Sequence, residues 1–175
     1  DAGLFNLPWG TLGLQDAAGT PGEPLILHRC VDVYRKVDVE GAIPAIAIRG
    51  LLRILVAIGS PESQTDQGEL LDTERELARI LDAVEPARDK GRAYVRILRR
   101  GTLEAIRDAL EAQRFHVLHI SCHAGPGVLV LEDAEGREDR VSAERFVSEL
   151  LPPNRGVPLI VLSGCMSGLV AAPLL

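Results

Sequence analysis

Four short apolar runs, separated by segments with helical spacing, constrain the fold of this chain more than any other feature. The first run is closed by Gly-Ser-Pro, a pattern typical of a strand buried on both faces of a parallel sheet. Strands that alternate with helices predict an α/β fold, with a mainly parallel sheet between two layers of helices. The four predicted strands are Leu52–Ile58, Ala93–Leu98, Phe115–Ser121 and Pro158–Leu162.

The segments between these runs carry the signals of helices. Residues 69–84 place apolar side chains at helical spacing and acidic side chains early, and Pro86 lies near the predicted end. Thr102 is placed to cap a helix that runs to about Ala112. Ser142 is placed to cap another that runs through residue 150.

A predicted β-hairpin interrupts this alternation after the third strand. Two short runs, residues 128–131 and 137–141, flank an acidic stretch with a glycine at residues 132–136. The carboxylates of this stretch fit a solvated turn better than an acidic site, because turns at a protein surface are commonly polar. We therefore expect a hairpin with an exposed tip.

Chain length bounds the domain organisation. At 175 residues the chain fits one domain, large enough to bury a core of its own. Within it we separate an N-terminal accessory segment, residues 1–50, from an α/β core, residues 51–175. Residues 1–24 are rich in Gly and Pro and predict a packed loop or short strands, and residues 25–29 predict a strand.

The charge balance argues against nucleic acid as a partner. The net charge is −6, whereas phosphate binding usually requires a basic face. The densest basic cluster, Arg96, Arg99 and Arg100, is interpreted as a solvated strand end.

The sequence favours a cytoplasmic protein. No apolar run reaches the roughly 18 residues of a membrane span, and the first residues lack the pattern of a signal peptide. The three cysteines are an odd number and do not suggest a disulfide framework, so a reducing compartment is the simplest expectation.

Two short segments carry the residues best suited to catalysis. His119–Gly125 and Leu162–Gly168 each combine the end of an apolar strand, a reactive residue and small residues. Because the ends of neighbouring parallel strands meet at one edge, we expect the imidazole of His123 to lie near the thiol of Cys165. A cysteine beside a base is the minimal equipment for nucleophilic catalysis by a thiol. The alternative is a buried small cysteine and a loop histidine without catalytic roles.

A zinc site competes for the same residues. His116, His119, Cys122, His123 and Cys165 are all of ligand type. Alternation along the strand places the first and third of these on the face opposite the second and fourth, so a site would need a bend. We instead expect a hydrogen-bonded His119 inside the sheet and a small, buried Cys122.

A phosphate-binding loop is the weaker rival. Gly125-Pro126-Gly127 lacks the spacing and the lysine of a P-loop, and proline removes one N–H donor. We therefore do not expect a phosphate-binding loop there.

The ordered set of motifs resembles the CHAT domain, a caspase-like peptidase module of bacteria that is often joined to tetratricopeptide repeats. Leu118–Ala124 resembles the family strand Leu-His-Phe-Ser-Gly-His-Gly. Ile160–Gly168 resembles its cysteine strand, Val-Val-Leu-Asn-Ala-Cys-Glu-Ser-Gly. Leu131–Asp133 resembles its hairpin, and Leu7–Trp9 resembles part of its early Pro-Trp-Glu-Leu-Leu segment. The resemblance covers nearly the whole chain in the right order.

This resemblance implies a caspase-like three-layer sandwich and a cysteine endopeptidase. His123 is implied to be the catalytic base and Cys165 the nucleophile. The backbone N–H groups of Ala124, Gly164 and Cys165 are implied to form the oxyanion hole. No cofactor or metal is needed. The implied partners are a protein or peptide substrate and a regulatory repeat or sensor region in the same or a partner protein, without nucleic acid or membrane.

The resemblance also leaves a second possibility. Caspase-like folds continue past the cysteine helix, whereas only ten residues follow Cys165 here, so we expect a sheet that is incomplete at the C-terminus and a chain cut from a longer protein. Ala124 stands where the family usually has glycine. The alternative function is therefore a catalytically inactive CHAT-like interaction or scaffold module.

Overall fold

The computed structural model describes residues 13–15, 18, 21–24, 48–62, 73–125, 127–152 and 156–164. The chain divides into two compact units, Asp1–Ile43 and Pro44–Leu175. Within the first unit, β1 (Gly13–Gln15) and β2 (Pro21–Pro24) pair in antiparallel fashion, so this part contains short strands. The strand expected at residues 25–29 lies outside the described residues.

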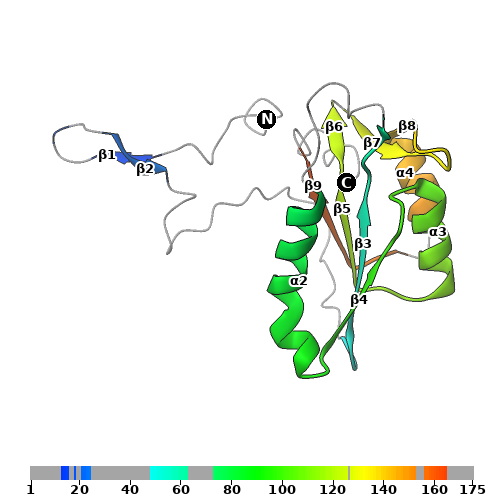
Figure 1. Cartoon of the computed structure of the whole chain (residues 1–175), viewed down its shortest axis with the longest axis horizontal. Helices are drawn as coiled ribbons and strands as arrows, with labels where there is room; N and C mark the ends of the chain where they lie inside the picture. Colours follow the sequence, from blue (N-terminus) through cyan, green and yellow to red (C-terminus); the bar gives the residue numbers. More distant parts are fainter. Residues whose placement is uncertain are drawn as a thin grey trace, which may run out of the picture. The chain divides into compact units, whose positions relative to one another are not determined.

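The second unit contains a four-stranded parallel sheet (Figure 1). Its strand order is β4-β3-β5-β9, and every neighbouring pair is parallel. All four apolar runs identified in the sequence form these strands, which confirms the predicted parallel sheet. The strands are β3 (Leu52–Ile58), β4 (Ala93–Ile97), β5 (Val117–Ser121) and β9 (Leu159–Ser163).

Helices lie on both faces of this sheet, as predicted. In Figure 1, α2 (Thr73–Asp89) lies on one side, and α3 (Leu103–Ala112) and α4 (Ala143–Leu150) lie on the other. The hydroxyl of Thr102 accepts a hydrogen bond from the N–H of Ala105, and that of Ser142 accepts one from Arg145. Both predicted helix caps are confirmed.

The helix α2 continues further than the sequence indicates. Its predicted end was residue 84, before Pro86, but the helix runs to Asp89 with the proline inside. Proline removes the hydrogen bond to the carbonyl of residue 82. Both of these residues are exposed, so water can bind that carbonyl and the helix is not forced to end.

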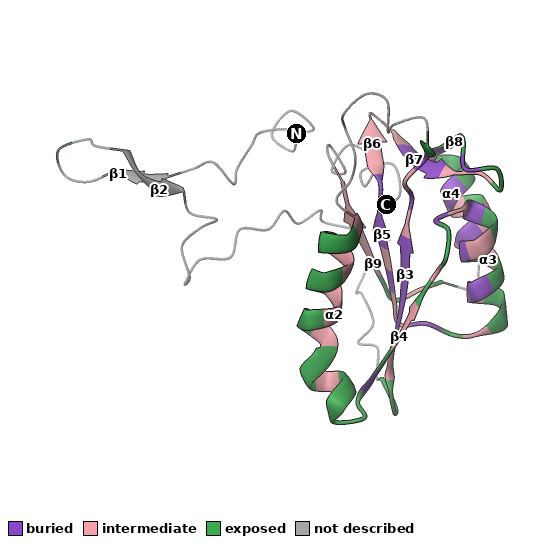
Figure 2. Ribbon diagram, in the orientation of Figure 1, coloured by how far each residue is buried: buried purple, intermediate pink, exposed green. Residues whose placement is uncertain are grey.

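The main core lies between the sheet and the pair α3 and α4. Leu55 and Leu118 from the sheet, Ile106 from α3 and Phe146 from α4 are all fully buried there (Figure 2). By contrast, α2 has no buried residue and presents mostly exposed and half-buried positions. The three-layer arrangement is consistent with a caspase-like fold, and its better-packed half is the layer of α3 and α4.

A small antiparallel sheet follows β5 directly. The predicted hairpin is confirmed as β7 (Val128–Glu132) and β8 (Glu138–Ser142). A third strand, β6 (His123–Gly125), which is not predicted from the sequence, pairs with β7. β6 has only three residues, two of them small, so its sequence shows no alternation of apolar and polar side chains. Its strand conformation comes from pairing with β7.

Candidate active site

The carboxyl ends of β5 and β9 lie side by side, as the sequence predicts. Ser121 of β5 is the register partner of Ser163 of β9, so both strands end at the same level. The N–H of Cys122 then donates to the carbonyl of Ser163 at 3.1 Å, which extends the pairing one residue past β5. The two segments selected for their chemistry therefore meet at one edge of the sheet.

Gly164 fixes how closely these segments approach. A Cβ atom at this position would lie 2.3 Å from the carbonyl oxygen of Cys122 and 3.8 Å from the Cβ atom of Ala124. Only glycine fits against that carbonyl without a backbone shift. Gly164 thus lies against the carbonyl of Cys122, the residue before His123. Gly164 is also the residue before Cys165, which lies outside the described residues.

His123 offers a ring nitrogen without an assigned partner. The residue is half-buried in β6, and its Nε2 atom is buried with no hydrogen-bond partner in the described part of the chain. Buried side-chain polar atoms are nearly always hydrogen-bonded. This nitrogen is therefore available to a group from outside the described residues or from a ligand, as a base or a proton donor requires.

Cys122 is structural, as the sequence indicates. Its side chain is 2% exposed and belongs to the core below the site. Burial raises the pKa of the Cys122 thiol to about 11, and a hydrogen bond from the backbone of Val130 opposes this rise only in part. A thiol with this pKa is protonated at neutral pH and is a poor nucleophile.

His119 differs from the expected hydrogen-bonded residue. Its Nε2 lies 3.4 Å from a carboxylate oxygen of Glu76 on α2, within ion-pair distance but outside hydrogen-bond geometry. The side chain thus faces α2 across the sheet, on the face opposite Cys122. Sequence alone gives no signal for Glu76, because this contact depends on how α2 docks.

The zinc alternative gains no support from the described residues. No group of three or more His, Cys, Asp or Glu side chains in the described ranges could hold a metal ion. His116 is engaged elsewhere, since its Nδ1 accepts a hydrogen bond of 2.9 Å from the backbone of Arg53. Cys122 faces the core, while His119 faces α2.

Two further glycines hold the neighbouring loops at the same edge. A Cβ atom on Gly101 would lie 2.4 Å from the carbonyl of Ile58, and one on Gly59 would lie 3.2 Å from the Cα of Leu131. The N–H of Gly101 also donates to the carboxylate of Glu132 at 2.6 Å. Close backbone contacts therefore join the loop after β4 to the end of β3, and the loop after β3 to β7. β7 is the strand that pairs with β6.

The acidic stretch is only partly the solvated turn that the sequence predicts. Asp133 organises the turn: it accepts hydrogen bonds from the N–H groups of Glu135 and Arg137. The bond from the Arg137 backbone is the main cause that lowers the pKa of Asp133. Glu132 is different, because its carboxylate binds Gly101 and ties the hairpin to the loop after β4.

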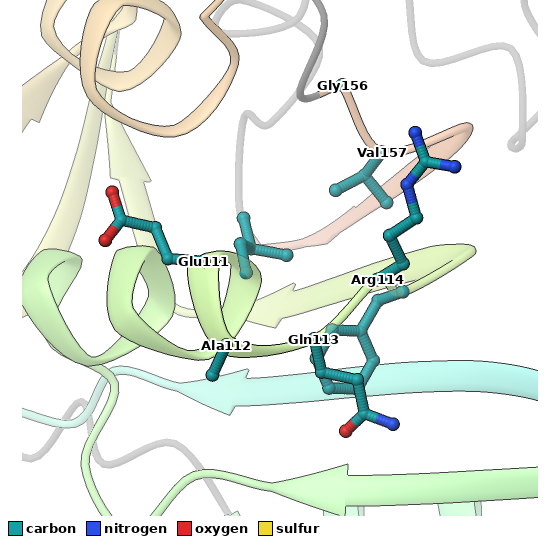
Figure 3. A pocket seen from close by; sticks show the side chains of 8 residues that line it. Glu111, Ala112, Gln113, Arg114, Gly156 and Val157 are labelled. Carbon is teal, nitrogen blue, oxygen red and sulfur yellow. The ribbon is translucent and has the colours of Figure 1, made fainter.

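A cavity of about 360 Å³ lies away from this edge. Figure 3 shows its lining, which comes from the end of α3, the turn before β5 and the segment before β9. In open α/β sheets, ligands bind beyond the carboxyl ends of the strands. This cavity lies at the amino ends, so we assign the candidate site to the opposite edge. The lining residues of the cavity that Figure 3 labels are Glu111, Ala112, Gln113, Arg114, Gly156 and Val157.

Comparison with known families agrees with this geometry. The model of the CHAT domain family matches residues 1–172. The chain belongs to the CHAT domain family. CHAT domains are a caspase-like peptidase family, so the resemblance seen in the motifs is confirmed over almost the entire sequence. No curated protein matches this CHAT domain. Among its described helices, none is long and apolar enough to cross a membrane.

Proposed function

We propose that this CHAT domain is a cysteine endopeptidase with His123 as base and Cys165 as nucleophile. One observation carries the proposal: Gly164, the residue before Cys165, lies against the carbonyl of Cys122, the residue before His123, and Nε2 of His123 has no hydrogen-bond partner among the described residues. That combination supports a thiol and an imidazole at one sheet edge, where α/β enzymes place their reactive groups.

The reaction follows from these roles. Nε2 of His123 takes the thiol proton, and the sulfur of Cys165 attacks the carbonyl carbon of the substrate. Backbone N–H groups of Ala124, Gly164 and Cys165 stabilise the oxyanion. His123 returns the proton to the leaving amine, which departs as the C–N bond breaks. Water then hydrolyses the thioester, and it releases the acid and restores the thiol.

Ala124 is compatible with this role. The residue packs against the main core cluster, so its methyl group lies on the face of β6 opposite His123. The methyl that replaces the family's usual glycine hydrogen is therefore directed away from the imidazole. The methyl group lies toward Gly164 instead, since a Cβ atom there would be 3.8 Å from the Cβ atom of Ala124.

The remaining features of the proposal come from the family. The proposed mechanism needs no cofactor or metal ion. The proposed substrate is a protein or peptide in the cytoplasm, and a repeat or sensor region in the same or a partner protein regulates cleavage. No membrane or nucleic acid takes part.

Cleavage of a proteome-derived peptide library tests the proposal. The whole protein, with any regulatory region it carries, is incubated with the library, and new peptide ends are identified by mass spectrometry. We expect cleavage by the wild type and by Cys122→Ala, the matched control. We expect a loss of at least about a hundredfold in Cys165→Ala and His123→Ala. Equal cleavage by Cys165→Ala and the wild type, or no cleavage by any variant, contradicts the proposal and favours the scaffold module.

A further inference from the structure

The strand β4 forms one edge of the parallel sheet. Among the described strands its only neighbour is β3, whereas β3 and β5 each have a neighbour on both sides. The carbonyl of Arg92 accepts a hydrogen bond of 2.8 Å from the N–H of Leu52, and the N–H of Leu98 donates to the carbonyl of Val56 at 2.9 Å. Every second residue from 92 to 98 therefore directs its backbone groups toward β3.

The residues between them direct their backbone groups away from the sheet. The N–H and C=O groups of Ala93, Val95 and Ile97 face outward, and no backbone hydrogen bond within the described ranges reaches them. Such a row is a template on which an extended segment can add as a further strand. Tyr94 is 41% exposed and Ile97 is 40% exposed, so side chains on both faces of this edge are accessible.

The polar side chains along this edge are basic. Arg92, just before β4, and Arg96 share one face of the strand with Tyr94 between them, and Arg99 follows the strand. No ion pair in the part of the chain that the structure describes involves any of these three arginines. Their charges are therefore available to a partner, on a chain whose net charge is −6.

The fold divides the basic cluster that the sequence shows here. Arg96 lies within β4 and Arg99 is exposed just after it, at the strand end that the sequence predicts. Arg100 instead donates to the carbonyl of Ala134 in the turn of the hairpin, so it holds two parts of the fold together. The edge itself is served by Arg92 and Arg96.

We propose that the edge of β4 binds an extended acidic segment of a partner protein, which adds to the sheet as a further strand. The outward backbone groups of Ala93, Val95 and Ile97 bind the backbone of that segment. Its acidic side chains lie opposite Arg92 and Arg96, because oppositely charged pairs across two strands are stabilising. This docking does not depend on the proposed peptidase function.

The spacing of the two arginines defines the acidic segment. They are four residues apart, about 13 Å along a strand, so the carboxylates of the segment are also four residues apart. Side chains that alternate with these carboxylates lie on the opposite face, beside Val95 and Ile97, and are therefore apolar. The partner carries a short run in which apolar residues alternate with polar ones, with an acid at every second polar position.

A second copy of this chain fits the same edge poorly. An antiparallel pair of β4 strands brings the arginines of both copies onto shared faces of the sheet, where like charges opposite one another are destabilising. Charges on an edge strand act in this way against pairing with a similar edge. The basic edge therefore favours an acidic strand over its own copy.

Binding of a labelled peptide to the whole protein, measured by fluorescence anisotropy, tests this inference. The peptide Val-Glu-Val-Thr-Val-Glu-Val reads the same in both directions, so it suits parallel and antiparallel addition. We expect saturable binding that weakens at least about fivefold in Arg96→Glu, the upper range of an exposed ion pair. Arg114→Glu, which reverses an exposed arginine outside β4, is the matched control and should bind like the wild type.

Two further peptides separate charge from strand addition. In Val-Lys-Val-Thr-Val-Lys-Val the charge is reversed, so the wild type should bind it much more weakly, and the double variant Arg92→Glu and Arg96→Glu should prefer it. A copy of the glutamate peptide with its three central backbone nitrogens methylated keeps every charge. We expect it to bind at least about tenfold more weakly, because backbone hydrogen bonds are lost.

Four results would overturn the inference. The first is no binding of the glutamate peptide to the whole protein. The second is equal binding of the methylated peptide, which indicates charge attraction without an added strand. The third is unchanged binding in Arg96→Glu or equal binding of the lysine peptide. The fourth is a dimer of the protein that excludes the peptide, which assigns the edge to a second copy. None of these results depends on cleavage.

Discussion

At the scale of single residues, Gly164 shows how one missing side chain organises the site. Its hydrogen atom lies where a Cβ would come within 2.3 Å of the carbonyl oxygen of Cys122. The conformation does not require a positive φ, so the constraint is steric. A larger residue must push the end of β9 away from β5, and with it the segment that carries Cys165.

Gly164→Ala should therefore damage the site more than the fold. We expect a loss of stability of about 1–3 kcal/mol, the usual cost of overpacking, and a larger fractional loss of peptide cleavage. Gly156→Ala is the matched control, since nothing lies within 4 Å of its added Cβ. Urea denaturation and the cleavage assay measure both effects. An alanine at 164 that leaves both quantities at wild-type values would show that the close contact with Cys122 is absent in solution.

At the scale of elements, the loop after β4 and the start of α3 act as one unit. Gly101 packs on the backbone after β3 and donates to Glu132, and Thr102 then caps the helix. Leu103 and Ile106 follow in the core. The segment before α3 thus contacts both the parallel sheet, at Ile58, and the hairpin, at Glu132. The first strand of that hairpin, β7, pairs with β6.

Thr102→Ala should cost about 1 kcal/mol of unfolding free energy, because the N–H of Ala105 loses its acceptor. Thr102→Ser keeps the hydroxyl and should stay close to the wild type. Chemical denaturation of the three proteins measures the difference. If Thr102→Ala and Thr102→Ser are destabilised equally, the loss comes from the missing methyl group. That result would contradict a stabilising role of the Thr102 hydroxyl as the helix cap.

At the scale of the whole molecule, the sequence predicts the layers well and the contacts between them poorly. Apolar runs and cap residues such as Thr102 are local signals, so the four strands, the hairpin and the helix starts follow from them. The pairing of β6 with β7 and the contact of Glu76 with His119 are non-local. The first depends on strand register and the second on how α2 packs against the sheet, and no single segment encodes either.

The candidate site could likewise be predicted only in part from the sequence. The motifs identify His123 and the segment around Cys165, because strand ends and small residues are visible in the sequence. The need for glycine at position 164 is not visible, since it arises from a carbonyl 42 residues earlier in the chain. The continuation of α2 through Pro86 is also missed, because exposure decides whether a lost hydrogen bond is tolerated.

The rate at which Cys165 reacts with iodoacetamide tests the central claim most directly. At pH 7 we expect Cys165 to react at least about tenfold faster than an ordinary thiol, because the imidazole favours the thiolate, and His123→Ala to abolish this advantage. Cys122 is the internal control: burial raises its pKa to about 11, so it should react very slowly. A Cys165 that reacts like an ordinary thiol, at the same rate with and without His123, would contradict the catalytic pair.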